Sequence, residues 1–144
     1  MATLSQRLRS ERGAELVEMA LVLPVLLLVF MGIVEFGFMF MRFVVLTNAA
    51  NEGARVAILP SYGAGDAEER ARSYAYSSGV PTGTVTAVMT PNINLTEGNR
   101  CATGRRVTVT HAYQFGYLSF LGTVNLTGRS TMRDQTASVA GACP

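Results

Sequence analysis

One stretch of this chain constrains its fold more than any other, because residues 16–46 are nearly all hydrophobic. Within it, the segment from Met19 to Met41 carries a single charge, that of Glu35. A helix of that length rises about 35 Å, enough to cross a hydrocarbon core about 30 Å thick. The alternative is a buried core helix, but too few residues remain to surround a stretch that is apolar on every face. We therefore predict a membrane span.

The charges on either side of this stretch predict its orientation. Arg7, Arg9 and Arg12 precede it, offset by Glu11, whereas Arg42 stands alone just after it. Positive charge favours the cytoplasmic side, so the N-terminus is expected inside and residues from about 45 onward outside. A secretory signal peptide would have a shorter apolar stretch followed by a small-residue cleavage site, so simple secretion is not expected.

The rest of the chain has the size of one small domain, whose single core is only modestly stabilising. Its two cysteines, Cys101 and Cys143, can pair in only one way, and an extracytoplasmic compartment would permit that disulfide. Two free, inert thiols are the alternative. The formal charge of +2 is too small to indicate nucleic-acid binding, and no basic stripe with interleaved aromatic residues is present.

Two helical segments are expected outside the membrane. The first continues the span through residues 47–59, where Ala49, Gly53 and Ala57 form a stripe of small residues that other elements can approach closely. The second is expected to begin at Asp66, whose side chain would cap it with Glu69 completing a capping box. It should end at Gly79–Pro81.

The remaining sequence alternates between apolar and polar residues, which is typical of strands. The apolar positions are Val85, Ala87 and Met89, then Val107, Val109, Tyr113 and Phe115, and then Val124, Leu126 and Met132. The prediction is an α+β fold, in which a long N-terminal transmembrane helix extends into a small pilin-like domain with a second helix and a three-stranded antiparallel sheet. The connector at residues 115–122 is unusually apolar and is either core or a docking patch at the bilayer or a partner.

The junction between the charged N-terminus and the apolar stretch reads RGAELVEMALVLP, residues 12–24. It resembles the processing site of type IV prepilins, in which a prepilin peptidase cuts after a Gly and a Glu follows at the fifth mature position. Gly13, Ala14 and Glu18 match that pattern. Together with residues 17–37 and 47–57, the junction resembles the TadE-like family of pseudopilins over about residues 13–57.

This resemblance implies an organisation and a set of partners. Residues 1–13 would be a cytoplasmic leader removed by cleavage, 14–59 the transmembrane helix with its amphipathic extension, and 60–144 an extracytoplasmic α+β domain. The partners would be the prepilin peptidase, other pseudopilins, the Flp-type pilin, the inner-membrane assembly platform and the lipid bilayer. Major Flp pilins carry Tyr after the Glu, whereas this chain has Met19, which favours an accessory pseudopilin.

Two readings from other functional classes stay open at this point. One is an uncleaved, signal-anchored protein that binds an extracytoplasmic ligand or a cell-surface molecule. The weaker one is a membrane-tethered enzyme.

The spacing of Glu18 from the cleavage point has a physical reason. A carboxylate in hydrocarbon is costly unless it has a partner. Cleavage after Gly13 would create an α-amino group at Ala14, one helical turn from Glu18, and the resemblance implies that such a Glu faces the amino terminus of a neighbouring subunit. Alternatively, Glu18 reaches the headgroups by itself.

Glu35 is the second charge in the apolar stretch. Arg42 lies seven residues later, about 20° away around a helix, so both side chains should point to one face. We hypothesise that Glu35 pairs with a residue on another helix, with Gly32 and Gly37 allowing that helix to approach. The alternative is interfacial solvation of Glu35 beside Arg42.

The sequence does not indicate catalysis. The only histidine, His111, falls on an apolar strand face and is expected to be a core or edge residue, and one His with two separated Cys makes no zinc site. Phosphate-binding glycine loops and nucleophile elbows are absent from the sequence. We therefore expect no metal, no cofactor and no enzymatic activity.

Overall fold

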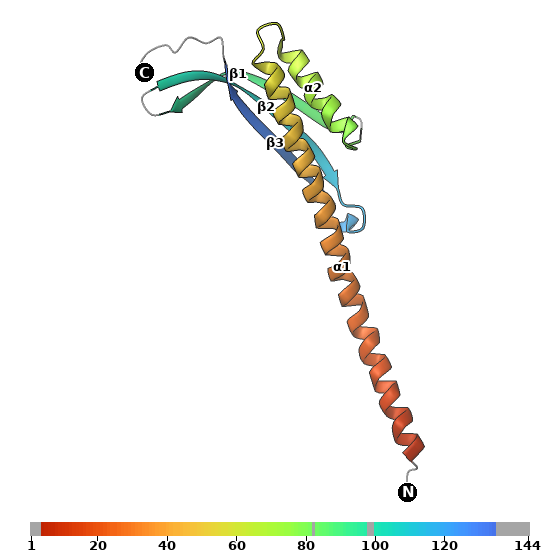
Figure 1. Cartoon of the computed structure of the whole chain (residues 1–144). Helices are drawn as coiled ribbons and strands as arrows, with labels where there is room; N and C mark the ends of the chain where they lie inside the picture. The colour runs from red at the N-terminus through yellow and green to blue at the C-terminus, as the bar shows by residue number, and fades with distance from the viewer. Residues whose placement is uncertain (1–3, 82, 98–99, 135–144) are drawn as a thin grey trace.

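The computed structural model describes residues 4–81, 83–97 and 100–134. The helices are α1 (Leu4–Ala57) and α2 (Ala64–Ser77), and the strands are β1 (Val85–Glu97), β2 (Arg100–Gln114) and β3 (Thr123–Arg133), with a 3-10 turn, η1 (Ser119–Leu121), before β3 (Figure 1). The predicted α+β class, with one long helix, a second helix and a three-stranded antiparallel sheet, is confirmed.

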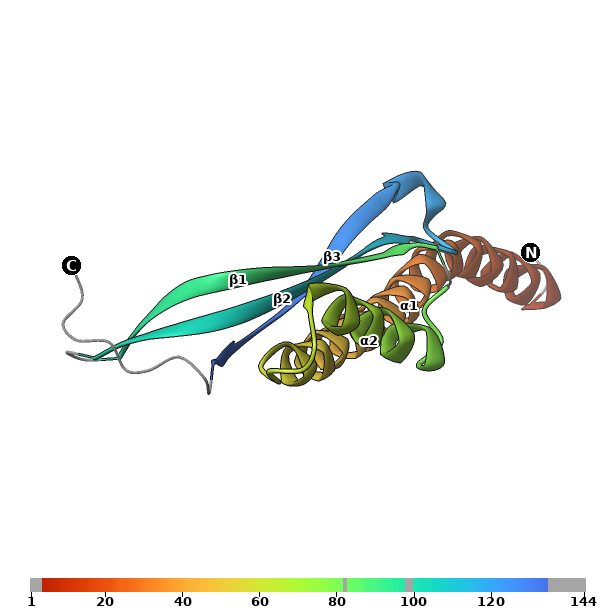
Figure 2. The same ribbon diagram turned by 90° about the horizontal axis from the view of Figure 1, so that it is seen from above.

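The sheet is a simple meander in the order β1-β2-β3, and both pairs are antiparallel. Val109 in the central strand lies opposite Ala87 of β1 and Gly128 of β3. The register shifts between Thr90 and Ile93, where the chain makes an irregularity in β1. Both helices lie on the same side of this sheet (Figure 2), so its helix-facing side is the core.

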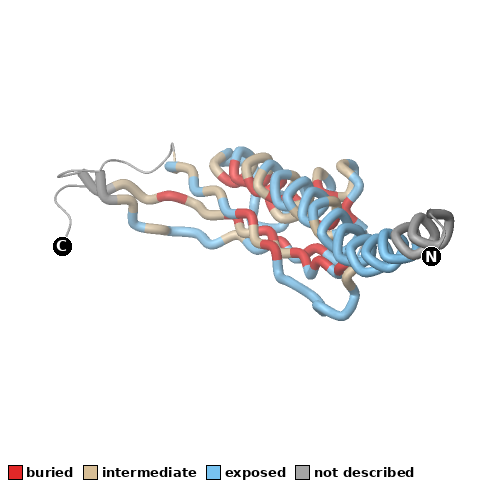
Figure 3. The backbone as a smooth tube through the Cα atoms, turned by 90° about the horizontal axis from the view of Figure 1, so that it is seen from below, coloured by how far each residue is buried: buried red, intermediate tan, exposed pale blue. Residues whose placement is uncertain are grey.

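Helix α1 has two parts with different surroundings. From Gly13 to Met31 every residue is exposed, and this part stands clear of the domain (Figures 1 and 3). From residue 32 onward, buried and exposed positions alternate as the helix packs against the domain. By length and composition, the segment Gly13–Ala57 could cross a membrane, and none of its most apolar part is buried. The helix is therefore a candidate membrane anchor that continues without a break into the domain.

The stripe of small residues on α1 is confirmed as the contact with α2. Ala49, Gly53 and Ala57 are all buried. A β-carbon added at Gly53 would lie 2.8 Å from the carbonyl oxygen of Ala67 and 2.9 Å from the β-carbon of Ala71, both in α2. Only glycine at this position lets the two helices approach so closely.

Helix α1 also packs closely against β3, at Gly128. A β-carbon there would lie 2.6 Å from the backbone nitrogen of Thr47 and closer still to the carbonyl group of Leu46. Leu46 is fully buried at this contact, as are Val107 and Val109 of the central strand. The strand and the helix therefore touch through their main chains.

The predicted start of the second helix was wrong by two residues. Helix α2 begins at Ala64, and Gly63 is its N-cap. Asp66 acts from the third helical position, since its carboxylate accepts a hydrogen bond of 2.8 Å from the Gly63 N–H. A side chain at that position reaches back to the orphan N–H of the N-cap, so Asp66 belongs to the first turn, not before it, and Glu69 takes no part.

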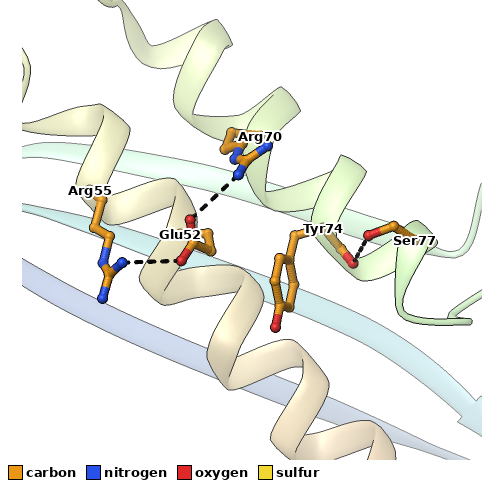
Figure 4. Close-up of polar contacts among 5 residues, drawn as sticks. All are labelled: Glu52, Arg55, Arg70, Tyr74 and Ser77. Atoms are coloured by element: carbon orange, nitrogen blue, oxygen red, sulfur yellow. Dashed lines mark hydrogen bonds and ion pairs between the residues drawn. The ribbon is translucent and has the colours of Figure 1, made fainter.

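Ion pairs on the surface link the two helices. The Glu52 carboxylate lies 3.4 Å from the guanidinium of Arg55 and 3.7 Å from that of Arg70 in α2 (Figure 4). The Ser77 hydroxyl donates a hydrogen bond of 2.9 Å to the Tyr74 carbonyl oxygen near the end of α2. Because the Arg55 and Arg70 side chains are largely in solvent, the two ion pairs contribute little to stability, about 0–1 kcal/mol.

The apolar face predicted for the third strand is covered at Leu126 but not at Val124. Leu126 is buried, whereas Val124 is 40% exposed. Both side chains fall on the same face by alternation, but β3 is an edge strand and Val124 is its second residue, at the exposed end next to the connector. Alternation identifies the face of a strand but not how far the helices cover it.

Candidate functional site

The feature that stands out on α1 is the carboxylate of Glu35. Every residue from Gly13 to Met31 is exposed, yet Glu35, one turn further along, is only 2% exposed. The end of the sheet nearer to the N-terminus, with the connector between β2 and β3, lies beside this part of α1 (Figure 1). The carboxylate therefore points into the domain and not into the surroundings of the helix.

Three donors from the domain bind this carboxylate. The Tyr113 hydroxyl donates to Oε1 at 3.0 Å, the Gly116 N–H donates to Oε1 at 2.8 Å and the Tyr117 N–H donates to Oε2 at 2.9 Å. Hydrogen bonds to an ionised acceptor are about twice as strong as neutral ones. We call Glu35, Tyr113, Gly116 and Tyr117 the carboxylate clamp.

The local structure of β2 and the connector positions these donors. Alternation along β2 points Tyr113 toward α1, and the ring of Phe115 meets the Tyr113 ring edge-on, with 5.5 Å between their centroids. The strand ends at Gln114, and the chain then turns so that two successive N–H groups, of Gly116 and Tyr117, face the carboxylate. Both carboxylate oxygens are thus bound by a preformed set of donors.

The surroundings keep the phenol of Tyr113 in its donating form. Burial raises the pKa of Tyr113, and so does its hydrogen bond to the Glu35 carboxylate, while the positive charge of Arg42 acts the other way. The phenol therefore stays protonated at neutral pH, which is the form that donates to Glu35.

Arg42 lies on the same side of α1 as Glu35, as their spacing predicted. Its guanidinium donates a hydrogen bond to the carbonyl oxygen of Gly79, just after α2. Arg42 also lines a small hollow of about 220 Å³, together with His111 and Tyr113. Both charged side chains of the outer part of the apolar stretch thus contact the chain's own domain.

The hypothesis that Glu35 pairs with another helix is not tested by a single chain and stays a prediction. What the structure adds is that the carboxylate already has three donors from its own domain and is buried, not solvated at an interface. A β-carbon added at Gly32 or Gly37 would meet nothing within 4 Å, so both glycines face open space on α1. A neighbouring helix could pack on that surface, and this packing stays a prediction.

The residues of the predicted processing site lie together on the exposed part of α1. Gly13, Ala14 and Glu18 are all exposed, and a β-carbon added at Gly13 would meet nothing within 4 Å. Within the described residues the domain supplies no partner for Glu18, and Gly13 faces open space. Cleavage after Gly13 stays a prediction.

The other predicted residues divide into two groups. His111 is buried, and its Nδ1 lies 3.3 Å from the Thr84 carbonyl oxygen, as expected for a core residue with a hydrogen-bond partner. Cys101 lies in β2, but the predicted pairing with Cys143 falls outside the described residues. Within residues 4–81, 83–97 and 100–134, no three His, Cys, Asp or Glu side chains gather in a way that could hold a metal ion.

The donors of the clamp were missed in the sequence. Tyr113 and the Gly116–Tyr117 pair are about 80 residues away from Glu35, and no local pattern connects positions so far apart. The signal was the carboxylate itself, because a charge in an apolar stretch requires a partner. The sequence showed that a partner was needed but not that the domain supplies it.

In the comparison with known proteins, a family model matches most of α1. Residues 13–55 match the family described as TadE-like protein, which confirms the resemblance over this segment. The matched segment begins at Gly13, contains both Glu18 and Glu35 and ends at Arg55, in the last turn of α1. No curated protein and no solved structure matches the chain.

Proposed function

We propose that this chain, whose residues 13–55 are TadE-like, is an accessory pseudopilin that acts in the biogenesis of a tight-adherence (Flp-type) pilus. In this proposal a prepilin peptidase removes residues 1–13, and the mature chain is a structural component with no catalytic activity of its own. The family match carries the proposal, because it covers the helix that holds both the processing junction and the buried acid.

The geometry around the junction supports processing. Gly13 and Ala14 lie on the exposed part of the helix, 22 and 21 residues before Glu35, so the domain stays more than about 30 Å away along the axis. The described residues that follow the junction, Gly13 to Met31, are all exposed, so the cut lies away from the packed part of α1. The new α-amino group at Ala14 would supply a positive charge one turn from Glu18, whose carboxylate otherwise enters an apolar medium unpaired.

The charge distribution supports an inner-membrane protein with its N-terminus in the cytoplasm and its domain outside. The partners in this proposal are the prepilin peptidase, other pseudopilins, the Flp-type pilin, the assembly platform and the lipid bilayer. Met19 in place of the Tyr of major pilins favours an accessory role over that of the main filament subunit.

N-terminal sequencing of the membrane-extracted chain, produced together with a prepilin peptidase, tests the proposal. The expected mature N-terminus is Ala14. Gly13→Val should block this processing, and since a side chain at Gly13 meets nothing within 4 Å, the variant should fold normally. Ala20→Val, also on the exposed face of α1, is the matched control and should be processed like the original chain.

Retention of Met1 or Ala2 in the presence of an active peptidase would contradict the proposal and favour an uncleaved, signal-anchored binding protein. Processing of Gly13→Val at the normal rate would also contradict it. The accessory role is tested in sheared filaments, where the chain should be far less abundant than the major pilin; equal abundance would mean that it is the main subunit.

A further inference from the structure

The connector between β2 and β3, residues 115–122, exposes large apolar side chains beside the candidate membrane helix. Tyr117 is 63% exposed, Phe120 77% and Leu121 50%, and the connector carries no charged residue. On α1, next to Glu35 in the sequence, Phe36 is 47% exposed and Phe40 is 62% exposed. Exposed aromatic and aliphatic residues that continue an apolar surface mark a contact with a further apolar phase or partner.

The clamp fixes the height of this connector along α1. Glu35 lies 17 residues beyond Glu18, which corresponds to about 26 Å of helix, and Arg42 lies 24 residues beyond it, or about 36 Å. The hydrocarbon core of a bilayer is about 30 Å thick. With Glu18 at the inner boundary, Glu35 and the connector bound to it reach the outer boundary, and Arg42 reaches the headgroups.

Four N–H groups of the connector are hydrogen-bonded within the protein, which favours that depth. Irregular backbone near lipid is tolerated only where its polar groups are bound within the protein. The N–H groups of Gly116 and Tyr117 are bound by the Glu35 carboxylate, the Leu121 N–H donates to the Leu118 carbonyl oxygen at 2.9 Å, and the Gly122 N–H donates to the Ser119 carbonyl oxygen at 3.1 Å. The Glu35 carboxylate thus accepts the hydrogen bonds of the connector's N–H groups that follow β2.

We propose that the connector is a second membrane contact, in which Tyr117, Phe120 and Leu121 insert into the interfacial region of the outer leaflet beside α1. Lipid is the occupant because the apolar surface is continuous with that of α1 at the level where the span ends. Aromatic side chains are enriched at that level, and no charge opposes their insertion. This inference rests on the membrane anchoring of α1 in the proposed function.

Tryptophan reporters test this contact directly, because the chain contains no tryptophan. The variants are Phe120→Trp in the connector, Phe30→Trp in the exposed part of α1 and Leu59→Trp beyond the end of α1, and all three positions are exposed. Each full-length variant is reconstituted at high lipid excess in phosphatidylcholine–phosphatidylglycerol vesicles, whose acyl chains carry bromine either near the glycerol or near the bilayer centre.

The expected quenching pattern separates the reporters by their depth in the bilayer. The Phe120→Trp emission should shift to the blue and lose more intensity with shallow bromine than with deep bromine. The Phe30→Trp emission should be quenched more by deep bromine. The Leu59→Trp emission should be insensitive to bromine and quenched by aqueous iodide. Leu121→Trp is a second connector reporter and should behave like Phe120→Trp.

The outcomes distinguish the inference from the proposed anchoring. Quenching of both connector reporters by iodide alone, with Phe30→Trp still quenched by lipid, would overturn the membrane contact and leave the anchor intact. A blue-shifted Phe120→Trp that neither bromine nor iodide quenches would show a protein partner, such as a second copy, and would also overturn it. Failure of lipid to quench Phe30→Trp would remove the anchor and, with it, this inference.

Discussion

Replacing Gly128 with alanine probes the contact on which the position of the domain depends. The added β-carbon would lie 2.6 Å from the Thr47 nitrogen, whereas ordinary contacts begin near 3.4 Å. The atoms in the way belong to the main chain of α1, which cannot rotate away as a side chain can. Removing this overlap therefore requires the helix and the sheet to separate by nearly 1 Å over the buried surface around Leu46.

The size of the effect follows from two opposing contributions. Alanine in a strand interior is by itself favoured over glycine by about 0.5–1 kcal/mol. Forcing extra volume into a packed core costs about 1–3 kcal/mol, and more where the neighbours cannot move. With main-chain neighbours the cost lies at the upper end, so the net loss of stability is about 2 kcal/mol. For a domain of this size that lowers Tm by about 8–16 °C.

Thermal unfolding of the full chain in detergent micelles, followed by near-ultraviolet circular dichroism of its tyrosines, measures this loss. Far-ultraviolet signals are less suitable because α1 stays helical in micelles. Gly65→Ala in α2 is the matched control, since a β-carbon there meets nothing within 4 Å, and its Tm should not fall. Adding Leu46→Ala to Gly128→Ala should give no rescue.

An unchanged Tm for Gly128→Ala would refute the close approach of β3 to α1. Rescue by Leu46→Ala would show that a side chain, and not the main chain, limits the distance.

Two further changes test the polar contacts of the domain. Because the pKa of Tyr113 is raised in the folded chain, its protonated form contributes stability below its ordinary pKa near 10, and that contribution is lost as pH rises through the folded value. Tm should therefore fall above about pH 10, and Tyr113→Phe should weaken this fall. An unchanged pH profile of Tm in the variant would refute the assignment to Tyr113. The guanidinium of Arg105 donates to the Ala57 carbonyl oxygen at the end of α1 and to Asp134. Without it, in Arg105→Met, hydrogen exchange in the last turn of α1 should quicken and stability should drop by about 1–3 kcal/mol. Unchanged protection of that turn would contradict the role of Arg105 as a cap of α1.

Periodicity predicted most of the fold because the relevant information is local. The small-residue stripe of α1, the alternation of the strands and the break at Gly79 each depend on neighbours within a few positions, and the structure has all three. The start of α2 was wrong by two residues because Asp66 can cap from either side of the helix start, and only the backbone of Gly63 decides between them.

The site was predictable only in part, for the same reason. Glu35 was identified from a single charge in an apolar stretch, and Arg42 from its place on the same face. Their partners come from Gly79 and the end of β2, positions that only the folded chain brings near the helix. The junction at Gly13 has no tertiary contact to find, so there the sequence and its TadE-like match carry all the information.

The continuity of α1 has a mechanical consequence. Between Gly13 and Ala57 the described chain is one continuous helix with one interior proline, Pro24, and the clamp ties it to the domain at Glu35, halfway between those two residues. From Glu35 to Ala57 the helix is held to the domain by the clamp and by its close contacts with α2 and β3, so turning this part of the helix about its axis must turn the domain as well. In the proposed function, such a subunit transmits torque and traction across the membrane surface instead of swivelling there.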